Sequence, residues 1–210
     1  MEDTIYAPSS AIGGAIAIIR VSGAEADKVK LLLDRDPTQT PREMVHARLS
    51  LSGELIDDCM AVYFSAPRSY TGEDMMELNV HGGTQTVQRV LGALATLEFR
   101  PADCGEFTKR AFLNGKMDLS AAEAVMDVIN ADAEQSLKSA LAQLQGSVKR
   151  EITSVEALLL DALSGIDAAI DYPDEAEADT LEALPESLTS AIARVDAMIA
   201  KARRGRVLRD

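Results

Sequence analysis

The chain has 210 residues, of which 47% are hydrophobic and 26% charged, a balance typical of one folded domain or two small ones. Its formal net charge of -13 excludes a generally basic surface for nucleic acid, although a local basic patch remains compatible with it. No apolar run approaches the ~20 residues of a membrane-spanning helix, so we expect no membrane partner. The two cysteines, Cys59 and Cys104, are too few for a disulfide framework and favour a cytoplasmic location.

Composition changes near residue 118. Residues 1–118 contain 12 basic and 17 acidic groups, whereas residues 119–210 contain 9 basic and 17 acidic groups. The first part holds most of the glycines and nearly all of the aromatic residues, and the second is rich in Ala, Leu, Glu and Asp. We therefore predict two domains, an α+β domain at 1–118 and an all-helical segment at 119–210.

The first domain shows the hydrophobic spacing of both strands and helices. We predict strands at 15–21, 45–51, 59–64 and 76–80, and helices at 24–33, 84–97 and 106–114. Gly53 favours a hairpin turn between the second and third strands. His81-Gly82-Gly83 predicts a tight strand-to-helix turn, and Gly115 predicts a helix end. The pattern indicates a mixed sheet with a few helices.

The second domain begins with Ser120-Ala-Ala-Glu123, which predicts a capping box before an Ala-rich helix. From residue 137 to residue 170, apolar residues recur in steps of 4, 3 and 4. This 11-residue repeat, about 3.67 residues per turn, predicts one long helix with Gly146 and Gly165 as weak points. Tyr172-Pro173 is expected to end that helix. An acidic connector at 171–179 and a second helix from about residue 180 are expected to follow.

These helices carry a continuous apolar stripe that two or three helices cannot enclose. We therefore predict that the stripe meets a partner chain or a segment absent from these 210 residues. The second helix ends in a cluster of basic residues, for which a solvated helix end and an RNA-phosphate contact are the two interpretations. The cluster consists of Lys201, Arg203, Arg204, Arg206 and Arg209.

Three charged residues fall where the predicted sheet should be apolar or where an element ends. Arg20 closes a buried strand, Glu77 opposes the apolar face of another, and Lys116 follows a helix-ending glycine. Each alone fits a solvated end. Together they suit a ligand with an amidine-like donor edge and a carboxylate tail. No metal-ligand spacing and no Gly-x-x-x-x-Gly-Lys-Ser/Thr loop occurs, so we expect no metal site and no nucleotide bound through a P-loop.

Several motifs, in order along the whole chain, resemble one family. They lie at 13–23 (GGAIAIIRVSG), 69–77 (SYTGEDMME), 81–83 (HGG), 105–119 (GEFTKRAFLNGKMDL) and 171–175 (DYPDE). The chain resembles the MnmE (TrmE) family of tRNA-modification GTPases. The resemblance implies a tetrahydrofolate-binding α+β domain that also forms a homodimer, followed by the first part of a helical domain. It also implies that the chain stops where the family's GTPase domain would begin.

The resemblance further implies that the full protein hydrolyses GTP and works with an FAD-dependent partner, MnmG. Together they add an aminomethyl or carboxymethylaminomethyl group to the wobble uridine of certain tRNAs. The implied cofactor is 5-formyl- or 5,10-methylene-tetrahydrofolate, while GTP, Mg and K belong to the GTPase domain. A non-catalytic dimerisation scaffold and a stand-alone folate-binding module are the alternatives.

The family's folate contacts map by motif onto Arg20, Glu77 and Lys116, and no catalytic residue is expected. We expect Glu77 to accept the pterin's N–H donors, and Arg20 and Lys116 to hold carbonyl or tail-carboxylate oxygens. Cys104 departs from the family pattern near this site. We expect it to fill a small buried apolar position.

Overall fold

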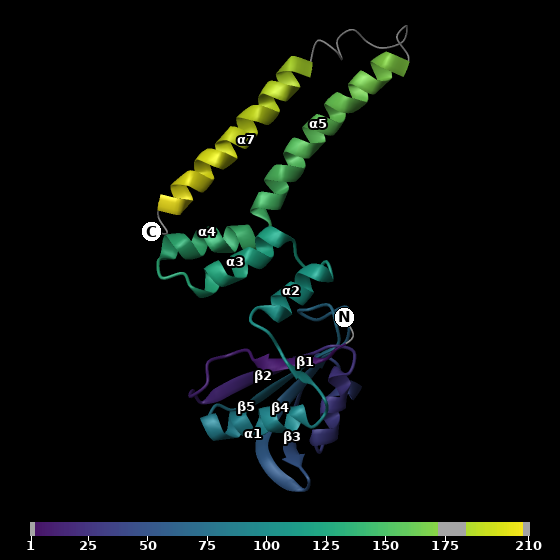
Figure 1. Ribbon diagram of the computed structural model, residues 1–210, viewed down its shortest axis with the longest axis vertical. Helices are drawn as coiled ribbons and strands as arrows, with labels where there is room; N and C mark the ends of the chain where they lie inside the picture. Colours follow the sequence, from purple (N-terminus) through teal and green to yellow (C-terminus); the bar gives the residue numbers. More distant parts are fainter. Residues whose placement is uncertain (1–2, 172–183, 208–210) are drawn as a thin grey trace. The chain divides into compact units, whose positions relative to one another are not determined.

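The computed structural model describes residues 3–171 and 184–207. The chain divides into two compact units, Met1–Met117 (unit 1) and Asp118–Asp210 (unit 2). Unit 1 contains a β-sheet with a few helices, and the described part of unit 2 is helical (Figure 1). The predicted α+β class is confirmed.

The six-stranded sheet of unit 1 has the order β3-β4-β5-β2-β1-β6. Neighbouring strands are antiparallel, except for β1 and β6, which are parallel. The strands are β1 (Ile5–Pro8), β2 (Ile16–Ser22), β3 (Met44–Leu51), β4 (Glu54–Phe64), β5 (Met75–His81) and β6 (Arg100–Pro101). The four predicted strands, which correspond to β2, β3, β4 and β5, are present. The sequence pattern missed β1 and β6 because strands of four and two residues are too short to show alternation.

Two helices, η1 (Ala26–Leu32) and α1 (Thr84–Ala95), form the core with one face of this sheet. Unit 1 also contains η2 (Pro37–Gln39) and α2 (Glu106–Leu113). Both η helices are short 3₁₀ helices. The helix predicted at 24–33 thus forms in the tighter 3₁₀ geometry that is common in short connectors. Ile19 and Leu78 from the sheet are fully buried with Val29 of η1 and Val87 of α1. Because side chains alternate along a strand, their neighbours in sequence point to the opposite face.

In the turn between β5 and α1, the backbone at Gly82 lies close to the backbone of Gly13 and Gly14. A Cβ atom added to Gly82 would lie 2.3 Å from the carbonyl oxygen of Gly14, and Gly13 N–H donates to the Gly82 oxygen at 2.8 Å. Only a glycine fits at this position. The predicted tight strand-to-helix turn is confirmed.

Unit 2 begins with α3 (Leu119–Ile129), whose cap differs from the predicted one. The N-cap is Asp118, whose carboxylate accepts the Ala121 N–H at 2.9 Å and the Ser120 hydroxyl at 2.7 Å. The predicted capping box at Ser120 is therefore wrong. The helix has already begun at Leu119, and Asp118 has the extended backbone of an N-cap residue.

The single long helix predicted from residue 137 to residue 170 is also wrong. Two helices occupy this region, α4 (Glu134–Leu144) and α5 (Ser147–Asp171). Between them Gly146 adopts φ +76°, a left-handed conformation that ends a helix. The apolar repeat continues on both sides of the break, so the spacing alone concealed it. The predicted connector beyond residue 171 and the predicted start near residue 180 lie outside the described residues.

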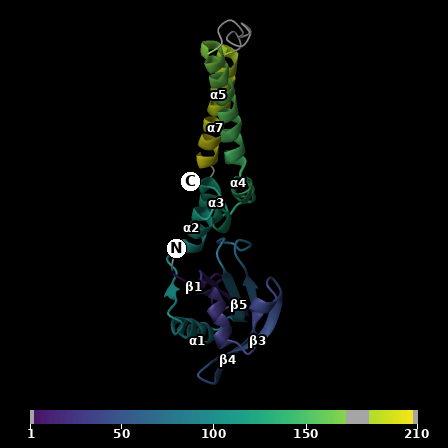
Figure 2. The same ribbon diagram turned by 90° about the vertical axis from the view of Figure 1, so that its right-hand side faces the viewer.

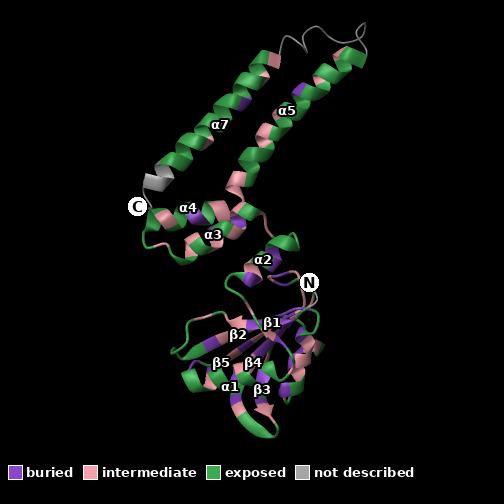
Figure 3. Cartoon of the chain, in the orientation of Figure 1, coloured by how far each residue is buried: buried purple, intermediate pink, exposed green. Residues whose placement is uncertain are grey.

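The helices α5 and α7 (Leu184–Val207) lie side by side in both views (Figures 1 and 2), and Arg194 of α7 donates to the Ser154 hydroxyl at 2.9 Å. Both are mostly exposed (Figure 3). The buried hydrophobic residues described in unit 2 are all alanines, whereas large residues such as Leu159, Leu163 and Ile192 are exposed. The predicted open stripe is confirmed for the described helices. Within the described residues, no helix is long and apolar enough to cross a membrane.

Candidate ligand-binding site

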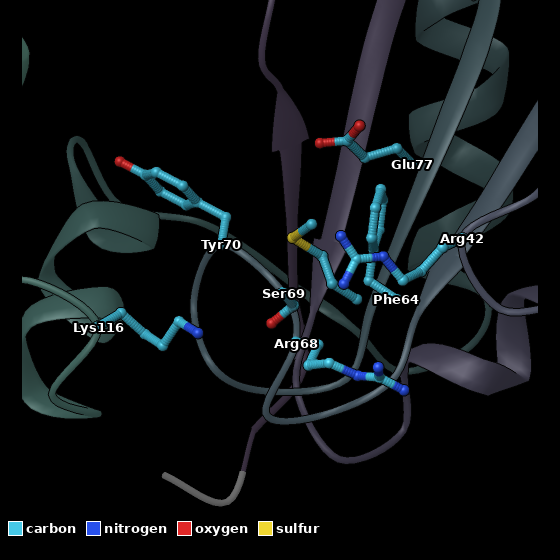
Figure 4. Close-up of a pocket in the computed structure, with 8 residues that line it drawn as sticks. Arg42, Phe64, Arg68, Ser69, Tyr70, Glu77 and Lys116 are labelled. Atoms are coloured by element: carbon cyan, nitrogen blue, oxygen red, sulfur yellow. The ribbon is translucent and has the colours of Figure 1, made fainter.

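A pocket of about 440 Å³ lies in unit 1 on the face of the sheet opposite the core (Figure 4). Its size falls in the usual range of small-molecule sites, roughly 300–1,000 Å³. Phe64 at the end of β4 and Glu77 on β5 form the sheet side of the pocket. The lining consists of Arg42, Phe64, Arg68, Ser69, Tyr70, Met75, Glu77 and Lys116.

Glu77 is paired with Arg20 across two neighbouring strands. The antiparallel register of β2 and β5 places these residues directly opposite each other. Arg20 Nε and Nη2 donate to the same carboxylate oxygen, Glu77 Oε1, at 2.8 and 2.7 Å. The two side chains are 22% and 17% exposed, so the pair is partly shielded from water. Glu77 Oε2 is therefore the oxygen with more capacity to accept a ligand's donor.

Two aromatic rings lie close to the Arg20 guanidinium group. Its guanidinium carbon lies 4.9 Å from the centroid of the Tyr70 ring and 5.5 Å from that of Phe107. Both distances are within the range of a cation–π contact. Arg20 is not among the lining residues. It positions Glu77 and connects the sheet to the 65–74 loop and to α2.

The end of α2 places Lys116 in the pocket. Gly115, with φ +70°, donates to the Phe112 carbonyl at 3.0 Å, and Lys116 N–H donates to the Ala111 carbonyl at 2.8 Å. This pair of bonds is a Schellman motif, which confirms the predicted helix end at Gly115. Lys116 Nζ then reaches the Pro67 carbonyl at 2.9 Å. The lysine thereby bridges the end of α2 and the pocket loop.

A buried arginine of α2 joins this loop to the segment before β1. Arg110 is fully buried and donates to Glu73 Oε2 at 3.1 Å and to Glu106 Oε1 at 3.0 Å. It also donates to the Asp3 carbonyl and carboxylate, each at 2.8 Å. Hydrogen bonds from Arg100, the Asp103 N–H and Arg110 outweigh burial and lower the pKa of the Glu106 carboxyl to about 2. The wall of the pocket formed by Tyr70 and Lys116 is thus fixed by charged hydrogen bonds.

The structure brings the three sequence-predicted residues into one region. Arg20 contacts Glu77, and Glu77 and Lys116 line the same pocket. Sequence reasoning gave no role to Arg42 and Tyr70. Tyr70 lies inside the 69–77 motif, a usable signal. Arg42 adopts φ +72° in the segment before β3 and donates its N–H to the Tyr63 carbonyl, and nothing in the sequence reveals this placement.

The two cysteines have different surroundings. Cys104, expected to be small and buried, is exposed, so that prediction is wrong. It lies in the short segment between β6 and α2, where the neighbouring residues Asp103 and Gly105 are exposed as well. Cys59 is buried, and burial raises the pKa of its thiol to about 12. Within the described residues, no group of His, Cys, Asp and Glu side chains is arranged to hold a metal.

The chain thus belongs to a class of proteins in which an α+β domain with a pocket is followed by a helical domain. Separate protein families match these two parts. Residues 4–116 match the family described as "GTP-binding protein TrmE N-terminus", and residues 119–210 match "MnmE helical domain". The chain belongs to the MnmE (TrmE) family of tRNA-modification GTPases. The expected family membership is confirmed.

Curated relatives match nearly the whole chain. The "tRNA modification GTPase MnmE" of Thermotoga petrophila is 43% identical over 206 residues, covering 94% of this chain and 46% of the relative. The proteins of the same name from Shouchella clausii and Carboxydothermus hydrogenoformans are 41% and 40% identical, over 99% and 100% of this chain and 47% and 48% of theirs. The chain thus spans about half the length of these relatives.

Proposed function

We propose that unit 1 binds a reduced folate, 5-formyl- or 5,10-methylene-tetrahydrofolate, in the pocket lined by Glu77 and Lys116. The observation that carries this proposal is a partly buried carboxylate beside aromatic rings, with cations around it. A pterin presents an amino group and ring N–H donors on one edge, and a folate tail ends in carboxylates. The pocket offers the complementary group for each end.

Each lining group has a separate role in this proposal. Glu77 Oε2 accepts a pterin N–H donor, while Oε1 stays with Arg20 or shares its bonds with a second donor. The rings of Phe64 and Tyr70 lie beside the flat part of the ligand. Lys116 exchanges its bond with the Pro67 carbonyl for a charge-assisted bond to a carbonyl or tail carboxylate.

For the whole protein, we propose the reaction that the family resemblance implies. Unit 1 forms a homodimer, and the protein acts with the FAD-dependent MnmG subunit on tRNA. Together they add an aminomethyl or carboxymethylaminomethyl group to the wobble uridine, the folate supplying one carbon. We assign GTP, Mg and K to a GTPase domain outside these 210 residues and place the reaction in the cytoplasm. The name of the relatives, tRNA modification GTPase, supports this assignment.

Calorimetric titration of the chain with 5-formyl-tetrahydrofolate monoglutamate tests the site. The variant Glu77→Gln keeps the size of the side chain but removes its charge, and we expect a roughly 30-fold loss of affinity, the size of a lost charged hydrogen bond. Asp58→Asn is the matched control, because Asp58 is an exposed carboxylate of the same sheet outside the pocket. Equal affinity in Glu77→Gln and the wild type contradicts the assignment.

Light scattering on the same samples separates the alternatives. Folate binding by a dimer supports the proposal. A dimer that binds no folate identifies a non-catalytic dimerisation scaffold instead, and a monomer that binds folate identifies a stand-alone module.

A further inference from the structure

The pocket of unit 1 has an excess of positive charge beyond what one folate tail requires. Arg42, Arg68 and Lys116 line it together with a single carboxylate, Glu77. That carboxylate is already paired with Arg20. No ion pair with a carboxylate is formed by Arg42, Arg68 or Lys116 in the part of the chain that the structure describes. Three cationic groups are therefore available to a ligand.

Most other basic residues of unit 1 form ion pairs, unlike these three. Residues 1–118 have more acidic than basic groups, so carboxylate partners are plentiful. Most basic residues of the unit do pair with carboxylates, and these are Arg20, Lys28, Lys30, Arg48, Arg89, Arg100 and Arg110. In a chain of net charge -13, a group of unpaired cations around one pocket indicates a polyanionic ligand.

The three cations come from separate segments that converge on the pocket. Arg42 precedes β3, Arg68 follows β4 in the 65–74 loop, and Lys116 follows α2. Figure 4 shows Arg42 and Lys116 on opposite sides of the pocket, and Arg68 at the end away from Glu77. All three are exposed, whereas Met75 in the lining is 2% exposed. The positive charge thus lies at the solvent side of the pocket.

We propose that this cationic rim, Arg42, Arg68 and Lys116, binds an oligoglutamate tail, so that the site prefers folates with several γ-linked glutamates. The proposal rests on the folate site proposed above. A monoglutamate tail has two carboxylates, and every further γ-linked glutamate adds one. Arginine guanidinium groups bind carboxylates through paired N–H donors, which suits a chain of regularly spaced carboxylates.

The test compares 5-formyl-tetrahydrofolate carrying one glutamate with the same compound carrying five, by calorimetry on the full chain. Exposed ion pairs each contribute about 0.2–1 kcal/mol, so two further pairs, with Arg42 and Arg68, predict a preference of roughly fivefold to tenfold for the pentaglutamate. The preference is expected to shrink when salt is raised from about 50 to about 300 mM, because exposed charges are screened.

The double variant Arg42→Gln/Arg68→Gln is expected to lose most of the preference, so that its affinities for the pentaglutamate and the monoglutamate become nearly equal. Arg89→Gln is the control, because Arg89 is an exposed arginine on α1 outside the pocket. Circular dichroism verifies that each variant is folded.

Three outcomes overturn the inference. Equal affinities for the two folates in the wild type overturn the preference and leave the folate site intact. Failure of both folates to bind overturns the folate site itself, and the inference with it. Displacement of the pentaglutamate, but not the monoglutamate, by a short RNA at equal charge concentration assigns the rim to phosphates instead.

Discussion

Arg110 and Glu106 place opposite charges inside unit 1, where they are 0% and 7% exposed. Desolvating such groups is costly, and the cost is offset only when their hydrogen bonds are satisfied. Arg110 Nη1 and Nη2 reach Asp3, Glu73 and Glu106, whereas Nε has no partner within the described residues. Removing one carboxylate from this network leaves the buried Arg110 guanidinium with fewer hydrogen-bond and charge partners. The loss of a single carboxylate is therefore expected to lower the free energy of unfolding of unit 1.

Glu106 therefore gives unit 1 a defined acid sensitivity. Its carboxyl has a pKa of about 2 in the fold against an ordinary value of 4.5, so its ion pair stabilises the fold fully above about pH 4.5. As the pH falls from 4.5 towards 2, the unfolded chain takes up the proton first and this contribution is lost. We predict that Glu106→Gln lowers the free energy of unfolding at pH 7 by on the order of 3 kcal/mol, and that the difference from wild type shrinks over this window.

Urea denaturation at pH values from 7 to about 3 measures both quantities. Glu43→Gln is the control, since Glu43 is an exposed carboxylate of the same unit, and it should change stability by less than about 0.5 kcal/mol. A difference between Glu106→Gln and wild type that is the same at every pH contradicts the prediction.

The ion pair between Arg20 and Glu77 shows which contacts between residues can be predicted from a sequence. Arg20, Glu77 and Lys116 were identified because charge interrupts an apolar pattern or follows a helix-ending glycine. The contact between Arg20 and Glu77 joins residues 57 positions apart and depends on β5 lying next to β2. Strand order is a property of the assembled sheet, so local spacing carried no information about it. The same applies to Arg42, whose approach depends on a left-handed backbone.

At the level of elements, the Schellman motif after α2 couples helix geometry to the pocket. Gly115 has φ +70°, a conformation that costs a residue with a Cβ atom about 1–2 kcal/mol. Gly92 in α1 is the natural comparison, because its backbone has no such φ value. A Cβ atom would meet nothing within 4 Å at either position. The two glycines differ in backbone conformation, not in available space.

We predict that Gly115→Ala lowers the free energy of unfolding by about 1 kcal/mol, while Gly92→Ala raises it by roughly 0.5–1 kcal/mol. Gly115→Ala should also weaken folate binding, because Lys116 is the next residue and depends on this turn. Urea denaturation and calorimetry measure the two effects. Shifts of the same sign in both variants mean that the backbone conformation at Gly115 does not limit stability.

The elements themselves were predictable where the sequence pattern is long and uninterrupted. Strands β2 to β5 and helices α1 and α2 were found from apolar runs, weak alternation or helical spacing. The break at Gly146 was not, because the 4-3-4 spacing continues through it and a glycine in a helix is often only a weak point. The cap at Asp118 was missed because Ser120 and Glu123 also satisfy a capping-box pattern, and only the helix start decides between them.

At the level of the whole molecule, the two units differ in their content of aromatic residues. All four phenylalanines and three of the four tyrosines lie in residues 1–117, whereas residues 119–210 hold helices rich in Ala and Leu. Every lining residue of the pocket also belongs to unit 1. Tyrosine signals therefore report mainly on unit 1, while the helical signal at 222 nm reports on both units.

We predict that 5-formyl-tetrahydrofolate stabilises unit 1 selectively. A ligand at a hundred times its Kd contributes about 2.7 kcal/mol to the state that binds it, which for a unit of this size raises the Tm on the order of 10 °C. Since every lining residue of the pocket belongs to unit 1, the tyrosine transition should move by that amount, while the part of the 222 nm transition that comes from unit 2 stays in place. In Glu77→Gln, with its roughly 30-fold lower affinity, the same ligand concentration should raise the tyrosine transition by only about a third as much. An equal rise of both transitions in the wild type would instead show that the two units unfold as one cooperative structure.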